Sequence, residues 1–252
     1  GHMIFNHAAG VQFSLGALSL NKMIIPIEFV NLNSQNLKLR NIRELVSFWN
    51  STKKELQKRI EHFDSIKHNA CDKAIFAELA FCIFTPQSKA VSCWNAVKIL
   101  DKKNLLYKGS AKEIANNITG VRFHNNKSKY LVEARNLFTI DKSIKIKNKL
   151  ESFKEKTELR KWLVDNIKGV GYKEASHFLR NIGMSGDLAI LDRHILKNLY
   201  YFKAIKEIPE TITEKKYIEI EKQMNEFCKK IKIPALHMDL LLWSLQTGGI
   251  FK

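Results

Sequence analysis

A lysine and an aspartate nineteen residues apart are the side chains of this sequence best suited to joint chemistry. Lys173 follows the turn Gly169-Val170-Gly171, and Asp192 directly precedes a second helical pattern. A lysine attacks an electrophilic carbon only as the neutral amine, and the positive end of a helix dipole disfavours the ammonium form. A nearby carboxylate can stabilise developing positive charge. The pair therefore indicates covalent catalysis by an amine with carboxylate support.

Two helices joined by a hairpin are needed to position Lys173. The apolar residues at helical spacing are Leu159, Trp162, Leu163 and Ile167 before the turn, and Ala175, Phe178, Leu179 and Ile182 after it. Gly169 and Gly171 permit positive φ and leave backbone N–H groups uncovered at the start of the second helix. Such a helix start favours an anion, and a DNA phosphate is the natural candidate.

Simpler explanations exist for two of these features. Lys173, Ser176, His177 and Arg180 fall at i, i+3, i+4 and i+7, which is also typical of a solvated helix face. Asp192 could serve only as the N-cap of its helix. Neither alternative explains why a lysine occupies the first turn of a helix, where the dipole is unfavourable to its charge.

The hairpin, Lys173 and Asp192 together resemble the helix-hairpin-helix DNA glycosylase superfamily. Residues 166–196 and the ending Thr247-Gly248-Gly249-Ile250-Phe251-Lys252 closely resemble archaeal-type 8-oxoguanine DNA glycosylase/AP lyases, and the similarity spans residues 40–252. This resemblance implies an enzyme of base excision repair that acts on double-stranded DNA containing 8-oxoguanine. It implies that Lys173 attacks C1′ and forms a Schiff base, and that β-elimination then cleaves the strand. Asp192 would support the oxocarbenium-like state and help to deprotonate Lys173.

Recognition of the base is expected from four further residues. 8-Oxoguanine carries a hydrogen on N7 that guanine lacks, so a pocket acceptor facing N7 would reject guanine. The resemblance implies that Phe123 and Trp243 sandwich the base, while Asp239 and the main chain and terminal carboxylate of Lys252 line the pocket. Asp239 and Trp243 share one side of a helix predicted over residues 234–246. Either aromatic residue could instead belong to the core.

Contacts with the rest of the DNA are expected from Gln87 and His194. Residues 85–88 separate helices predicted over residues 72–84 and 89–100, and this junction resembles the loop that superfamily members insert beside the extruded base. Gln87 is the side chain expected to enter the duplex. The alternative is a plain capping turn made by Thr85 or Ser88. His194 resembles a family histidine that contacts a phosphate near the flipped nucleotide.

The charge of the chain fits a polyanionic partner. Forty-two Lys and Arg residues against 25 Asp and Glu residues give a net charge of +17. Solubility or a generally basic proteome would be a simpler cause, but affinity arising from this surplus should fall steeply with salt. No uninterrupted apolar run reaches the length of a membrane span. We therefore expect a monomer without membrane association, located in the cytoplasm with the nucleoid.

The four cysteines argue against a metal cluster. Cys71, Cys82, Cys93 and Cys228 contain no CxxC pair, and only Cys228 lies in the C-terminal region where some relatives hold an iron–sulfur cluster. We expect all four to be small buried residues in a reduced compartment. No metal and no cofactor are expected.

Strand signals are scarce, and the helical patterns predict an all-α fold. Further helices are predicted over residues 41–62, with an interruption at Ser51-Thr52, and over residues 128–138 and 214–231. The resemblance implies a helical barrel domain over residues 70–183, ending in the hairpin motif. Residues 4–69 and 184–252 would form the other domain, with DNA across the cleft between them. Residues 4–30 are expected to form a short strand pair or loop, with a leader segment as the alternative.

Two other functions compete with this interpretation. One is an endonuclease III-type glycosylase for oxidised pyrimidines, against which the missing cluster cysteines and the Gly248 to Lys252 ending both count. The other is a non-catalytic helix-hairpin-helix module that only grips DNA. Such a module needs Gly169 and Gly171 but gives no reason for Lys173 and Asp192 together.

Overall fold

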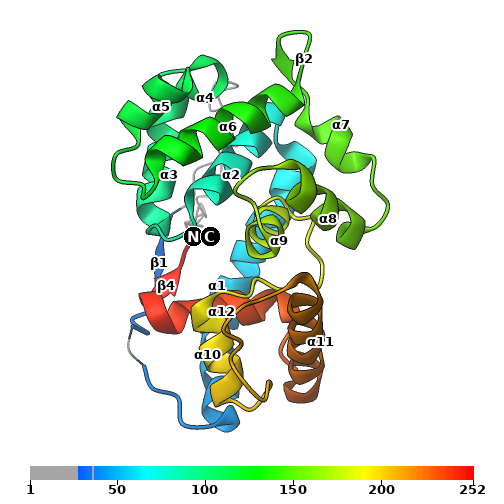
Figure 1. The fold of residues 1–252 in the computed structure, drawn as a ribbon. Coiled ribbons are helices and arrows are strands. Elements are labelled where there is room, and N and C mark those ends of the chain that lie inside the picture. The colour runs from blue at the N-terminus through cyan, green and yellow to red at the C-terminus, as the bar shows by residue number, and fades with distance from the viewer. Residues whose placement is uncertain (1–27, 36) are drawn as a thin grey trace, which may run out of the picture.

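Helices dominate the computed structural model, which describes residues 28–35 and 37–252 (Figure 1). This confirms the expected all-α fold. In chain order the helices are α1 Ile42–Asn69, α2 Asp72–Phe84, α3 Ala90–Lys102, α4 Leu105–Lys108, α5 Ala111–Asn117, α6 His124–Phe138, α7 Ile146–Glu151, α8 Lys156–Asn166, α9 Tyr172–Asn181, α10 Arg193–Tyr201, α11 Glu214–Ile231 and α12 Ala235–Thr247.

Two short antiparallel ribbons complete the described part of the chain. Strands β2 (Thr139–Ile140) and β3 (Ser143–Ile144) form a hairpin between α6 and α7. Strand β1 (Val30–Asn31) pairs with β4 (Gly249–Ile250), so that the last residues of the chain run beside residues 30–32 (Figure 1). Of the stretch 4–30, for which a strand pair or loop was expected, residues 4–27 lie outside the described residues and Val30 lies in β1.

Buried side chains form two core clusters, one in each half of the molecule. The first surrounds α2 and draws on α3 to α9, and every α2 residue from Ala74 to Phe84 is buried. The second joins α10, α11 and α12 to most of α1. Helix α1 links them, because Phe63 belongs to the second cluster and Ile66 to the first. Trp243 of α12 packs against both clusters.

Three sequence-based expectations about local structure were wrong. Helix α1 continues through Ser51-Thr52 because the Thr52 hydroxyl donates to the Phe48 carbonyl at 2.8 Å, inside the helix. Helix α6 begins at His124 instead of Ser128, directly after Phe123 in a left-handed conformation with φ 57°. Cys71 is exposed because it precedes the first turn of α2, whereas the other three cysteines are buried as expected.

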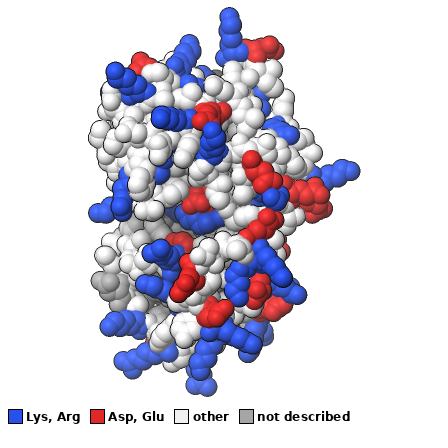
Figure 2. Space-filling view, viewed as in Figure 1, with Lys and Arg blue, Asp and Glu red and all other residues white. Residues whose placement is uncertain are grey.

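Basic side chains spread over the face seen in Figure 2, on both halves of the molecule, while acidic side chains gather near α8 and α11. In the described part of the chain, no helix combines the length and the apolar character needed to cross a membrane. The described residues also contain no group of three His, Cys, Asp or Glu side chains placed to hold a metal ion.

Candidate active site

The hairpin between α8 and α9 has the predicted form, but its two glycines adopt different backbone conformations. Gly169 adopts φ +79°, and a Cβ there would lie 2.6 Å from the ring of Tyr130, so both conformation and space require glycine. Gly171 is extended, with φ −95° and ψ −174°, so the expected positive φ is not used there. Its N–H donates to the Glu174 carboxylate at 3.3 Å. A carboxylate of the chain therefore already lies at this helix start.

Lys173 lies in the first turn of α9 with its side chain partly open to solvent. The side chain is 24% exposed, and Nζ is 3.6 Å from the Glu174 carboxylate. Among the described residues, Glu174 is the acidic side chain within salt-bridge distance of Lys173, and Asp192 lies beyond that distance. Glu174 was missed from the sequence, although its position three residues after Gly171 is the usual place of a capping glutamate.

Asp192 is the N-cap of α10, as expected. Its Oδ1 accepts from the N–H groups of His194 and Ile195, both at 2.8 Å, which fixes the carboxylate and leaves Oδ2 outside these cap bonds. The residue is half-buried. His194, also half-buried, therefore contributes its backbone to the cap. Capping is part of what Asp192 does, and its second oxygen is not committed to it.

The segment before Asp192 is held by a buried polar network that the sequence did not reveal. Arg160 of α8 pairs with Glu221 of α11 at 2.5 Å and 2.9 Å. Glu221 accepts from the Ala189 N–H at 2.7 Å. The Tyr217 hydroxyl donates to the Ala189 carbonyl at 2.8 Å and accepts from the Leu191 N–H at 3.1 Å. Three backbone groups within three residues of Asp192 are thereby fixed.

The polar stripe along α9 is not a solvated face, so that alternative is wrong. Ser176, His177 and Arg180 are all buried, because α9 lies between the two core clusters. His177 meets the Phe81 ring edge-on at 5.5 Å between ring centroids, and neither of its ring nitrogens has a hydrogen-bond partner among the described residues. Burial, and after it the positive charges of Arg180 and Lys173, hold the pKa of His177 well below its usual range.

Asp239 and Lys252, both expected at the base, lie in two buried ion pairs. Asp239 pairs with Arg180 of α9; burial raises the pKa of Asp239, and the Arg180 guanidinium opposes that rise. The Lys252 side chain pairs with Glu78 of α2, and its Nζ lies 3.3 Å from the centroid of the Trp94 ring. Burial lowers the pKa of Lys252 while Glu78 opposes that change.

Glu78 had a signal in the sequence. It is the only acidic residue after the first turn of a helix that is otherwise apolar all round, and a charge in that setting requires a buried partner. Asn181 of α9 donates to the other Glu78 oxygen at 3.1 Å. Which cation would pair with Glu78 could not be predicted, because Lys252 lies 174 residues away along the chain.

Phe123 and Gln87 lie in exposed turns with left-handed backbone. Phe123 is 54% exposed, so the alternative that it belongs to the core is wrong, and the Arg122 guanidinium lies 5.6 Å from its ring centroid. Gln87 is exposed with φ 55°. Side chains of this size rarely adopt such backbone angles, and residues held there often belong to functional sites. Thr85 does close α2, because its hydroxyl donates to the Cys82 carbonyl at 2.9 Å.

A buried lysine ties these two turns together. Lys127, in the second turn of α6, donates to the carbonyls of Phe84 and Pro86, each at 2.6 Å, and to the Ser88 hydroxyl at 3.2 Å. Ser88 accepts in turn from the Arg122 N–H at 3.0 Å. Ser88 therefore links the turns and does not cap α3, whose N-cap is Lys89. Burial lowers the pKa of Lys127 to about 8.

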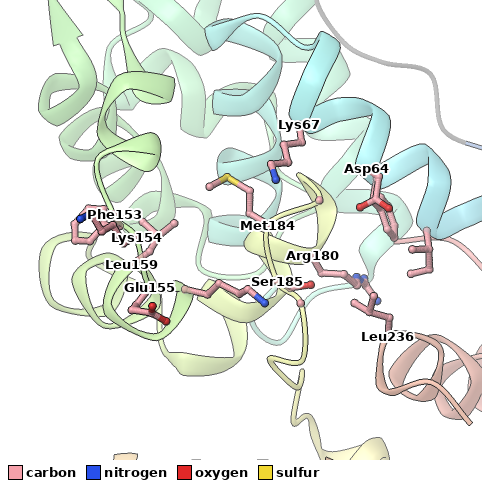
Figure 3. A pocket seen from close by; sticks show the side chains of 15 residues that line it. Asp64, Lys67, Phe153, Lys154, Glu155, Leu159, Arg180, Met184, Ser185 and Leu236 are labelled. Atoms are coloured by element: carbon pink, nitrogen blue, oxygen red, sulfur yellow. The ribbon is translucent and has the colours of Figure 1, made fainter.

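A cavity of about 390 Å³ lies apart from Lys173 and Asp192, although Arg180, the partner of Asp239, lines it (Figure 3). It is bounded by α1, the segment before α8, the turn after α9 and the start of α12, and neither Lys173 nor Asp192 lines it. Lys67, Met184, Arg180 and Leu236 are among the side chains that line it (Figure 3). Its position does not coincide with the candidate catalytic pair.

Comparison with known families identifies the chain. A family model described as 8-oxoguanine DNA glycosylase matches residues 56–233. The chain belongs to the 8-oxoguanine DNA glycosylase family. A relative from Fusobacterium nucleatum, named 8-oxoguanine DNA glycosylase/AP lyase, is 46% identical over 83% of this chain and 96% of its own length. One of the same name from Methanocaldococcus jannaschii is 39% identical over 84% and 99%.

Solved structures of the family share the fold. The Methanocaldococcus jannaschii 8-oxoguanine glycosylase/lyase, in complex with a 15mer DNA containing 8-oxoguanine, superposes with a TM-score of 0.75 at 36% identity, covering 84% of this chain and 99% of that one. The Thermotoga maritima 8-oxoguanine DNA glycosylase gives a TM-score of 0.74 at 31% identity, covering 84% and 98%. Family membership confirms the resemblance identified in the sequence.

Proposed function

We propose that this chain is a bifunctional DNA glycosylase/AP lyase that excises 8-oxoguanine from double-stranded DNA. The observation that carries this proposal is the placement of Lys173 and Asp192. Each lies at the start of a helix, one as a partly open amine and the other as a carboxylate fixed by two N–H groups, in a chain of the 8-oxoguanine DNA glycosylase family.

In the proposed reaction, the neutral Lys173 amine attacks C1′ of the damaged nucleotide, and the bond from C1′ to the base breaks with its electron pair leaving on the base. Nζ then loses a proton, which neutralises the departing base. The Asp192 carboxylate stabilises the positive charge that develops on the sugar. Opening of the sugar ring gives a Schiff base between Nζ and C1′. Loss of a proton from C2′ then expels the 3′ phosphate, which cleaves the strand, and hydrolysis of the Schiff base restores Lys173.

Base recognition is assigned to the four residues expected from the sequence. Phe123 and Trp243 would hold the extruded base between their rings, and Asp239 and Lys252 would line its edge. The exposure of Phe123 supports this assignment, as does the partial burial of Trp243 where it packs against the two core clusters. Asp239, which pairs with Arg180, places a hydrogen-bond acceptor in a buried site. A base that leaves such an acceptor without a donor loses on the order of 1–3 kcal/mol of binding free energy.

The remaining contacts are proposed for the DNA around the lesion. Gln87 would enter the space left by the extruded base, His194 would contact a phosphate, and the Gly169 to Gly171 turn would approach a second phosphate through its backbone. The exposed left-handed turn at Gln87 supports its place. We further propose two domains, residues 70–183 and the flanking segments, in a monomer that acts on nucleoid DNA in the cytoplasm.

The test is borohydride trapping on matched duplexes that contain 8-oxoguanine, guanine or thymine glycol at one position. We expect an adduct and strand cleavage with the 8-oxoguanine duplex alone, and a lower yield as salt concentration rises. An adduct only with thymine glycol would favour the endonuclease III-type activity. Binding without any adduct would favour a DNA-gripping module. Phe123→Ala should reduce adduct formation on 8-oxoguanine more than lyase activity on an abasic duplex, which has no base to stack.

A further inference from the structure

The buried pair of Arg160 and Glu221 lies between the two elements that carry Lys173 and Asp192. Arg160 is 1% exposed and comes from α8, the first helix of the hairpin. Its guanidinium lies 5.1 Å from the ring centroid of Tyr172, the residue directly before Lys173. One of its nitrogens also lies 3.2 Å from the Ser176 hydroxyl of α9. Arg160 is therefore bound to the α9 start on one side.

On its other side, Arg160 reaches the segment that ends at Asp192. Glu221 accepts two hydrogen bonds from Arg160 in a two-pronged pair and uses one of its oxygens for the Ala189 N–H. Tyr217, whose ring centroid is 5.6 Å from the guanidinium, holds Ala189 and Leu191 through its hydroxyl. The path from Tyr172 to Leu191 thus runs through one guanidinium, one carboxylate and one phenol, all buried.

We propose that Arg160 and Glu221 are positioning residues that set the placement of Lys173 relative to Asp192. This rests on the proposed function. The two helix starts lie where the core clusters meet, because Ala175 of α9 belongs to the first cluster while Leu191 belongs to the second and Tyr172 packs against it. Apolar packing is non-directional, so it does not by itself fix the angle between these segments. A two-pronged Arg–carboxylate pair fixes direction as well as distance.

Stability alone is a poor explanation of this pair. Removing two charges from water costs enough that well-packed apolar residues of similar size are often equally stabilising in their place. Arg160 of α8 also contacts α9 and α11 through directional contacts, whereas an apolar residue would fill the same space without fixing the angles between these helices. A misplacement of about 1 Å between reacting groups can reduce a rate by about 100-fold.

The test combines Arg160→Met with Asp192→Asn and measures single-turnover base excision and duplex binding. In wild type, Arg160→Met should lower the rate constant of excision by about 10- to 100-fold while the Kd for the duplex changes less than about threefold. In the Asp192→Asn background, the same substitution should change the rate less than about threefold, because the carboxylate that it positions is already lost.

Matched variants separate positioning from general loss of structure. Arg135→Met removes another buried arginine, in α6, far from Asp192 in sequence, and should lower Tm with little effect on the rate. Glu221→Gln keeps an oxygen for the Ala189 N–H and provides a second variant if Arg160→Met fails to fold. It should show the same dependence on Asp192.

Equal rate losses from Arg160→Met or Glu221→Gln with and without Asp192→Asn, or no rate loss at all, would overturn the positioning role. Failure of the proposed function is distinguishable, because wild type itself would then give no adduct with the 8-oxoguanine duplex. An active wild type with additive losses would leave the function standing and remove only the role of the pair.

Discussion

Two lysines lie near helix starts in contrasting environments: Lys127 in α6 and Lys173 in α9. Lys127 is buried and donates to three oxygens of the turn from Phe84 to Ser88. Lys173 is partly open and has one carboxylate, at 3.6 Å. An ammonium with all its hydrogens committed holds structure together, whereas a nucleophile must be able to give one up. The difference indicates which of the two lysines is built for reaction.

The largest effect should come from Lys173→Gln. Glutamine keeps a polar side chain of related length but has no amine to form a Schiff base. We expect strand cleavage and borohydride trapping on the 8-oxoguanine duplex to fall by at least about 1,000-fold. Duplex binding, measured by fluorescence anisotropy, should stay within about threefold of wild type. Retained trapping would remove Lys173 from the mechanism.

Asp192→Asn should have the next largest effect. Asparagine can still accept the cap bonds of α10 through its side-chain oxygen, but it cannot stabilise positive charge on the sugar. Single-turnover excision should slow by about 100- to 1,000-fold with lesion binding retained. If turnover were unchanged, capping would be the whole purpose of this residue.

Lys127→Met should affect stability more than chemistry. The carbonyls of Phe84 and Pro86 would each lose the lysine donor, although the Cys93 thiol still donates to Phe84 at 3.2 Å. We expect the free energy of unfolding to fall by about 1–3 kcal/mol, measured by urea titration. The adduct on Lys173 should still form. Loss of the adduct in a folded Lys127→Met protein would contradict the division of roles between the two lysines.

The smallest effect is a pH dependence that belongs to Lys127. Burial lowers its pKa to about 8, whereas the unfolded chain keeps a value near about 10.4. Between these values the unfolded state binds more protons, so the contribution of this group to stability rises as pH rises. Wild type should therefore gain stability relative to Lys127→Met between pH 8 and 10. Parallel stability curves for the two proteins would show that Lys127 titrates normally.

The sequence predicted the elements that local pattern determines. The hairpin, the capping carboxylate of Asp192 and the mostly apolar α2 follow from glycine placement, N-cap chemistry and helical periodicity over a few residues. Even so, Thr52 did not interrupt α1, because a hydroxyl within a helix can bond to the preceding turn.

What the sequence could not supply is the pairing of buried charges. Arg160 and Glu221 lie 61 residues apart, and each falls where a helix pattern looks solvated. The α9 stripe of Ser176, His177 and Arg180 was ambiguous for the same reason. A polar helix face buried between two core clusters and a polar helix face in water show the same sequence pattern. Only tertiary structure distinguishes them.

The most direct test of the central claim is to locate the trapped sugar on the chain. After borohydride reduction on an 8-oxoguanine duplex, nuclease and protease digestion followed by mass spectrometry should find the deoxyribose remnant on the peptide containing Lys173, at its Nζ. A remnant on Lys127 or on any other lysine, or on the chain's α-amino group, would contradict the account.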